Sequence, residues 1–232
     1  MYYGMYYDWT YILVLIGVGL SLLASAKVNG TFNKYSRIPN RTGMTGKEAA
    51  EQILHSSGIY DVRVERIAGN LTDHYDPSSK VLRLSDSTYG STSVAAIGVA
   101  AHECGHAIQH QVSYGPLVLR STLVPVANFG AKISWPMIIL GLIVGSFQPL
   151  LTLGILAFSL SVIFQIVTLP VEFNASSRAL KVLESNKILG FDEISQTRKV
   201  LSAAALTYLA AAAASVLQLL RLVILFGGRD RD

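Results

Sequence analysis

The chain has 232 residues, and with 51% hydrophobic residues and a mean hydropathy of +0.42 it is more apolar than an ordinary soluble domain. Its net charge is +4, and no cluster of arginine with aromatic residues occurs, so we expect an anionic lipid surface and no nucleic acid among its partners. The single cysteine, Cys104, excludes a disulfide within the chain.

The first predicted element is a membrane anchor over residues 1–26. Residues 11–26 form an uncharged apolar run, preceded by tyrosines and Trp9 that resemble an interfacial aromatic belt. The alternative is a cleaved signal peptide, because Ala24-Ser25-Ala26 resembles a cleavage site. Signal peptides begin with a positive region, whereas the first ten residues hold Asp8 and neither Lys nor Arg, which favours an uncleaved anchor.

A polar stretch with mixed helix and strand patterns follows the anchor. The predicted elements are a helix over residues 45–56, a strand over 62–67 and a hairpin of strands 71–75 and 80–84. An edge strand of this small sheet would be able to hold an extended peptide by strand addition. His74 and Tyr75 are then either polar contacts to that peptide or simply surface residues beside the turn.

The most informative pattern is His102-Glu103-Cys104-Gly105-His106, inside a proline-free helix predicted over Val94–Gln111. Residues four apart share a helix face, so both histidines are placed to bind one metal ion, and Glu103 is placed to take a proton from a metal-bound water. The alternative is two histidines that only satisfy hydrogen bonds in a core. His110 lies about 12 Å along the helix from His102, too far for the same ion, and we expect it at the rim of the site.

A catalytic zinc ion usually has three protein ligands, so a third is needed elsewhere. Glu172 is the candidate, because it ends an uncharged run from Ile133 and follows Pro170, which is placed to start a helix. Ala175 and Ala179 share its face and would let that helix approach closely. The alternative is a surface carboxylate in a first helical turn. Cys104 is turned about 200° around the helix from the histidines, so we expect it to pack in the protein interior rather than to bind the metal ion.

Three further spans are predicted from the remaining apolar runs, two of them joined at Gln148-Pro149. The expected organisation is a transmembrane anchor (1–26), a cytoplasmic catalytic domain (27–132), a transmembrane hairpin (133–169), a cytoplasmic helical segment with the third ligand (170–202), and a transmembrane helix and tail (203–232). Sixteen of the nineteen Lys and Arg residues then lie on one side, which the positive-inside rule makes cytoplasmic, with the N-terminus outside.

The segments Asp73-His74-Tyr75-Asp76-Pro77 and Ala101 to Gln109 resemble the bacterial neutral zinc metallopeptidase family of membrane proteins, and the similarity covers essentially the whole chain. That family is similar to gluzincins, including the membrane-bound heat-shock protease and the CAAX prenyl protease. The resemblance implies an α-helical membrane protein with about four transmembrane helices and a small α+β gluzincin-like catalytic domain. It also implies zinc bound by His102, His106 and Glu172, with Glu103 as general base. Gluzincins carry Asp four residues after the glutamate ligand, where this chain has Ser176.

These observations predict a membrane-bound zinc endopeptidase of the bacterial cell membrane, active on the cytoplasmic side on unfolded or membrane-associated polypeptides. The residue that stabilises the oxyanion is left open among Arg178, His110, His74 and Tyr208. Three alternatives remain: an inactive metal-binding scaffold, an intramembrane site-2-type protease, whose aspartate motif is absent here, and a metal transporter.

Overall fold

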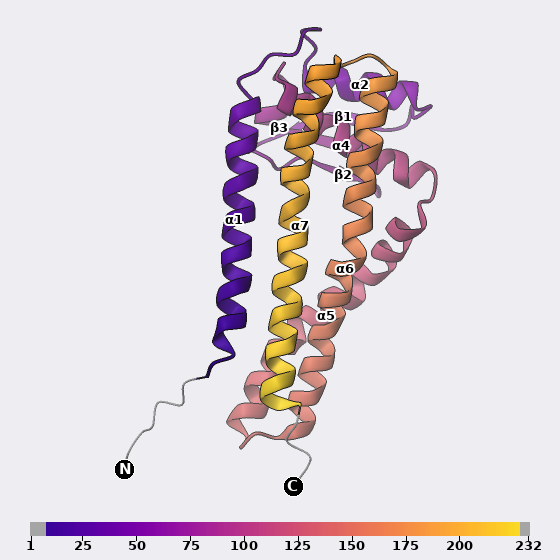
Figure 1. The fold of residues 1–232 in the computed structure, drawn as a ribbon. Helices are drawn as coiled ribbons and strands as arrows, with labels where there is room; N and C mark the ends of the chain where they lie inside the picture. The colour runs from indigo at the N-terminus through magenta and orange to yellow at the C-terminus, as the bar shows by residue number, and fades with distance from the viewer. Residues whose placement is uncertain (1–7, 228–232) are drawn as a thin grey trace. The chain divides into compact units, whose positions relative to one another are not determined.

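The computed structural model of the chain describes residues 8–227 and consists mainly of helices, with one small sheet (Figure 1). The helices are α1 (Tyr11–Tyr35), α2 (Gly46–Ser56), α3 (Asp86–Tyr89), α4 (Val94–Gln111), α5 (Gly115–Ile143), α6 (Gln148–Ser185) and α7 (Phe191–Phe226). The strands are β1 (Arg63–Ile67), β2 (His74–Asp76) and β3 (Val81–Ser85).

The chain divides into two compact units. Within the described residues, the first comprises 8–23, 119–167 and 208–227, and we call it the apolar unit. The second comprises 24–118 and 168–207, and because it holds the sheet we call it the α/β unit.

The sheet of the α/β unit has the strand order β1-β3-β2, with β1 parallel and β2 antiparallel to β3. The predicted strand at 62–67 and the predicted hairpin are confirmed, although β2 begins only at His74. The hairpin turn is held by the Asp76 carboxylate, which accepts a hydrogen bond from the Ser78 backbone N–H at 3.0 Å. The central strand β3 is buried, so β2 is one of the two edges of the sheet.

Helices α2 and α4 form the core of this unit, and both begin where their capping residues predict. Thr45 and Glu48 form a capping box on α2, and the Ser93 hydroxyl accepts a hydrogen bond from the Ala96 N–H at the start of α4. The bounds predicted for α4 from its sequence are confirmed. The core buries apolar side chains of both helices together with β3 and the second half of α6, among them Ile53, Leu54, Leu82, Leu84, Ile97 and Leu183.

Four helices, α1, α5, α6 and α7, are long and apolar enough to cross a membrane, which confirms the predicted number of spans. Only 11–28% of the residues in their most apolar windows are buried inside the protein, as expected for helices that face lipid. Inside the apolar unit they approach each other at small residues: a Cβ built on Gly17 would lie 3.1 Å from the Ala214 Cβ. Arg221 is held by Asp8 at 2.7 Å and by the Tyr11 ring at 4.3 Å.

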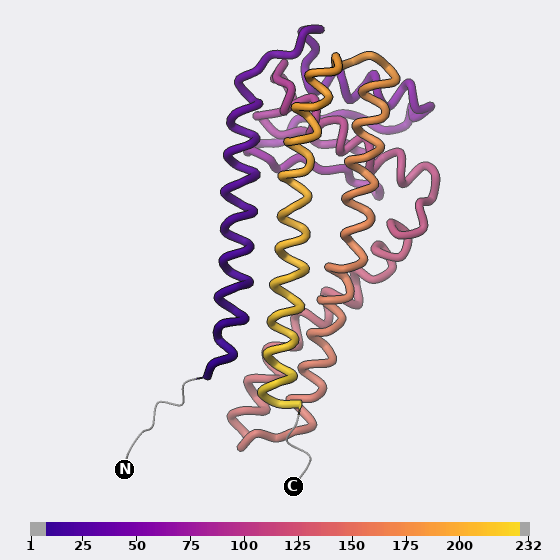
Figure 2. Tube along the Cα trace, in the orientation of Figure 1, coloured from indigo at the N-terminus to yellow at the C-terminus, as the bar shows by residue number. Residues whose placement is uncertain are grey.

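Two predictions about prolines need correction. The turn between α5 and α6 lies at residues 144–147, where Gly145 and Ser146 adopt positive φ, and Pro149 falls in the first turn of α6, where its missing N–H costs nothing. Pro170 does not start a helix: it lies inside α6, which continues from the apolar run to Ser185 (Figure 2). Proline is tolerated inside transmembrane helices, and it therefore marks no boundary here.

Candidate metal centre

Three side chains of the α/β unit bring their ligand atoms together. His102 and His106 project from consecutive turns of α4 and Glu172 from α6, and one ligand atom of each lies within 4.8 Å of the others. The Glu172 Oε2 atom is 3.3 Å from His102 Nε2 and 3.5 Å from His106 Nε2. Tetrahedral zinc ligands at about 2.0–2.2 Å from the ion are about 3.3–3.5 Å apart, so the two distances from Glu172 fit that ion.

The outer nitrogens of both imidazoles have hydrogen-bond partners. His102 Nδ1 lies 3.1 Å from the Ser176 hydroxyl, and His106 Nδ1 lies 3.0 Å from Gln109 Oε1. The Gln109 amide nitrogen donates to the Val171 carbonyl at 2.8 Å, which leaves Oε1 as an acceptor. His106 Nδ1 therefore donates to Gln109, and Nε2 is turned toward Glu172. Outer partners of this kind orient metal-binding histidines and fix their tautomers.

The charge around His106 favours a cation. Burial of the ring lowers the pKa of His106, but the hydrogen bond that the imidazole donates to Glu172 and the charges of Glu103 and Glu172 raise the pKa above its ordinary value. Two carboxylates thus lie close to the imidazoles, and both are buried: Glu172 is 3% and Glu103 is 8% exposed. A divalent cation would compensate these charges, which is the second way in which the residues fit zinc.

A glycine lets the two ligand helices come together. A Cβ built on Gly105 would lie 2.5 Å from the carbonyl oxygen of Ala175, which is a backbone atom of α6. Ala175 and Ala179 are 0% and 1% exposed, as expected if small residues allow this approach. Gly105, between the two histidines, therefore sets the separation of the helices that carry the ligands.

Several residues considered from the sequence are not among the three clustered ligands. Cys104 is fully buried, its thiol points to the Ala50 carbonyl at 3.6 Å, and burial raises the pKa of the thiol, so the expected packing role is confirmed. Arg178 donates to the Asn174 side chain at 2.7 Å and lies over the Tyr114 ring. Tyr208 belongs to the apolar unit.

His110 forms a polar pair at the edge of the sheet. Its Nδ1 atom lies 2.9 Å from the hydroxyl of Tyr75 on β2. Burial, together with the charges of Asp61 and Asp76, raises the pKa of Tyr75 to about 12, so the phenol remains a neutral hydrogen-bond donor at physiological pH. The pair lines a hollow of about 540 Å³ next to the last turn of α4. His74 bonds instead to the Thr72 carbonyl at 2.9 Å.

Sequence reasoning assigned no role to Gln109 and Asn174. Gln109 lies three residues after His106, a spacing that places the two side chains side by side on a helix, and this was the available signal. The role of Asn174, which accepts from Gln109 at 3.0 Å and from Arg178, depends on the contact between α4 and α6 and has no local signal.

The fold and the site together define a helical membrane protein whose α/β unit gathers two histidines and a glutamate. A known protein family matches this chain. The chain matches the family described as "Putative neutral zinc metallopeptidase" over residues 10–227 and belongs to it, as the resemblance in its sequence predicts. It is also 49% identical over 221 residues to a protein of Bacillus subtilis (strain 168) named "Putative membrane protease YugP", covering 95% of this chain and 98% of that protein. No solved structure matches.

Proposed function

We propose that the protein is a membrane-bound zinc endopeptidase of the gluzincin type. His102, His106 and Glu172 hold the zinc ion, and Glu103 is the general base. The observation that carries this proposal is the set of three converging ligand atoms, with both histidine Nε2 atoms aimed at Glu172 and both Nδ1 atoms held from outside.

Zinc, when bound, supplies a Lewis acid and lowers the pKa of a coordinated water to about 7. Glu103 adjoins the ligand His102 in sequence and is nearly buried, so its carboxylate accepts the water proton as the oxygen attacks the scissile carbonyl. The protonated Glu103 then returns the proton to the leaving amine. Ser176 and Gln109 keep both imidazoles oriented during these steps.

The substrate is a polypeptide in extended form, either unfolded or associated with the membrane. Strand β2 is an edge of the sheet, so an extended segment can pair with its outer side by strand addition. Tyr75 on this strand and His110 on the metal helix offer polar groups to that segment.

We propose that the protein lies in the bacterial cell membrane with its metal centre on the cytoplasmic side, because sixteen of the nineteen basic residues fall on that side of the four spans predicted from the sequence. A cysteine at Ser78, introduced in a Cys104→Ser background, should be protected from an impermeant reagent in intact cells. Labelling of that cysteine in intact cells would show that the proposed orientation is wrong and that the metal centre faces outward.

The catalytic proposal is tested by cleavage of casein in detergent, with and without a chelator. Glu103→Gln should fold, retain its zinc and lose about 10²–10⁴-fold in turnover, the usual contribution of a general base. Glu172→Ala should lose both zinc and turnover. Equal cleavage by the wild type and Glu103→Gln would reject the mechanism, and full zinc without cleavage by the wild type would identify a metal-binding scaffold instead.

A further inference from the structure

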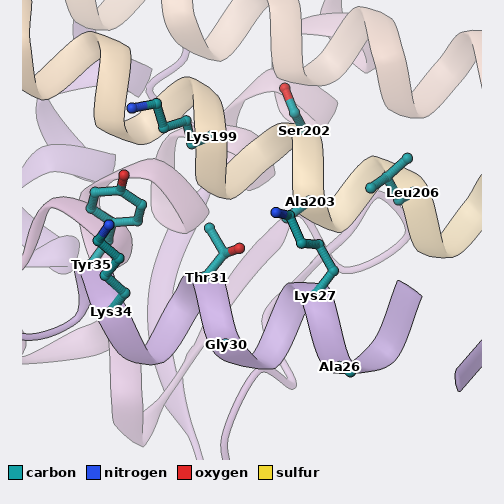
Figure 3. Close-up of a pocket in the computed structure, with 10 residues that line it drawn as sticks. All are labelled: Ala26, Lys27, Gly30, Thr31, Lys34, Tyr35, Lys199, Ser202, Ala203 and Leu206. Carbon is teal, nitrogen blue, oxygen red and sulfur yellow. The ribbon is translucent and has the colours of Figure 1, made fainter. Parts of the chain in front are cut away.

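A second hollow of the α/β unit, of about 640 Å³, lies between the second half of α1 and the first half of α7 (Figure 3). It contains none of the metal ligands, and three lysines line it: Lys27 and Lys34 from α1, and Lys199 from α7. Thr31 adds a hydroxyl between the two α1 lysines.

The positive charge of this hollow is uncompensated. No acidic residue lines it, and within residues 8–227 none of the three lysines takes part in an ion pair. Lys34 has only the Tyr35 ring nearby, at 5.4 Å. Three ammonium groups around one hollow attract an anion, and lysine binds phosphate as a point charge.

The lining changes from apolar to basic along the hollow. In Figure 3, Ala26 and Leu206 lie at one end, and Lys34 and Lys199 lie toward the other. Lys27 lies between these ends and extends from α1 toward α7. A ligand that fits this arrangement has an anionic group at one end and an apolar body at the other.

The lysines also stand at the ends of the apolar runs. Lys27 is the first charged residue after the uncharged run 11–26 of α1, and Lys199 is the last before the uncharged run 200–220 of α7. About 20 residues cross the hydrocarbon core, so we expect both lysines where their helices leave it, at the depth of the lipid phosphates.

We propose that this hollow binds the headgroup phosphate of an anionic phospholipid, with the glycerol and upper acyl chains against the apolar end. This binding site is distinct from the metal centre proposed above, because none of the residues that line it is a metal ligand.

The test is native mass spectrometry of the full-length protein in nonionic detergent, titrated with phosphatidylglycerol. Attraction of an anionic lipid surface is worth about fivefold in affinity per lysine, so Lys27→Gln/Lys199→Gln should bind on the order of twenty-fold more weakly. The matched control Lys181→Gln/Lys187→Gln removes the same charge from the end of α6 and its following turn, outside the hollow, and should bind as the wild type does.

Phosphatidylcholine, which carries the same phosphate without net charge, should bind the wild type much more weakly than phosphatidylglycerol. Equal binding of the two lipids, or an equal loss in both double variants, would overturn the proposal. Displacement of the lipid by millimolar inorganic phosphate would assign the site to a free anion and overturn it too. If Lys27→Gln/Lys199→Gln fails to fold, two other measurements test the proposal. Lys27→Arg/Lys199→Arg, which keeps both charges, must bind phosphatidylglycerol as tightly as the wild type, and the wild type must prefer phosphatidylglycerol to phosphatidylcholine.

Discussion

Replacing Gly105 with alanine should separate the two helices that carry the metal ligands. The new Cβ would lie 2.5 Å from the Ala175 carbonyl oxygen, so the helices must move apart by about 0.5 Å merely to reach 3.0 Å, below which real Cβ contacts essentially never occur. Overpacking of this kind costs about 1–3 kcal/mol, offset by about 1 kcal/mol because alanine favours a helix more than glycine. The net loss of stability is therefore small, at most about 2 kcal/mol.

The effect on the metal should be larger than the effect on stability. Glu172 Oε2 now lies 3.3 and 3.5 Å from the two histidine nitrogens, and metal sites tolerate deviations of only about 0.2 Å in ligand distances. A shift of about 0.5 Å should lower zinc affinity on the order of 10–100-fold, as changes around a ligand shell do.

Competition with a chromophoric chelator measures this affinity, and thermal unfolding with and without zinc measures stability. Gly98→Ala is the matched control on the same helix, because its Cβ would meet a side-chain methyl of Thr197 at 2.8 Å rather than a backbone atom. It should bind zinc nearly as the wild type does. Wild-type affinity in Gly105→Ala would refute the reasoning that this glycine sets the ligand geometry.

Three further predictions test the surroundings of the site. Ser176→Ala, which removes the partner of His102, should weaken zinc binding about 10–100-fold, whereas Ser176→Asp should restore or strengthen it in the same chelator competition. Cys104 should resist alkylation in the native protein and react after denaturation, because burial raises the pKa of the thiol; mass spectrometry before and after urea measures this, and rapid native labelling would contradict it. Hydrogen bonds from Ser78 and Ser79 lower the pKa of Asp76, so its contribution to stability is present above its unfolded pKa near 3.8 and is lost as the pH falls through the lower folded value. Acid unfolding of Asp76→Asn should accordingly depend less steeply on pH than that of the wild type.

Capping residues, proline positions and helix spacing are local signals, and they predicted correctly the elements whose bounds depend on local interactions. Val94–Gln111 has a capping residue at one end and no proline inside, and its bounds agree with the structure. Helix spacing places His102 and His106 on one face, and the isolated Glu172 lies beside them.

The features that the sequence did not predict depend on the surroundings of a residue. Pro170 has the same local preference at the start of a helix as inside a transmembrane helix, and only the apolar run before it distinguishes the two. The role of Gln109 depends on the approach of α6, which supplies the Val171 carbonyl and thereby orients the amide. No spacing within α4 carries that information.

The continuity of α6 has a consequence for the synthesis of the protein. The two histidines lie on α4, which is not among the candidate spans, whereas Glu172 lies on the same unbroken helix as the apolar run that begins at Gln148. The ribosome produces the histidines some seventy residues before the glutamate, whose helix continues from an apolar run long enough to cross a bilayer. We therefore expect the three ligands to come together only after this helix has formed, so the proposed metal centre would be completed late in the synthesis of the chain.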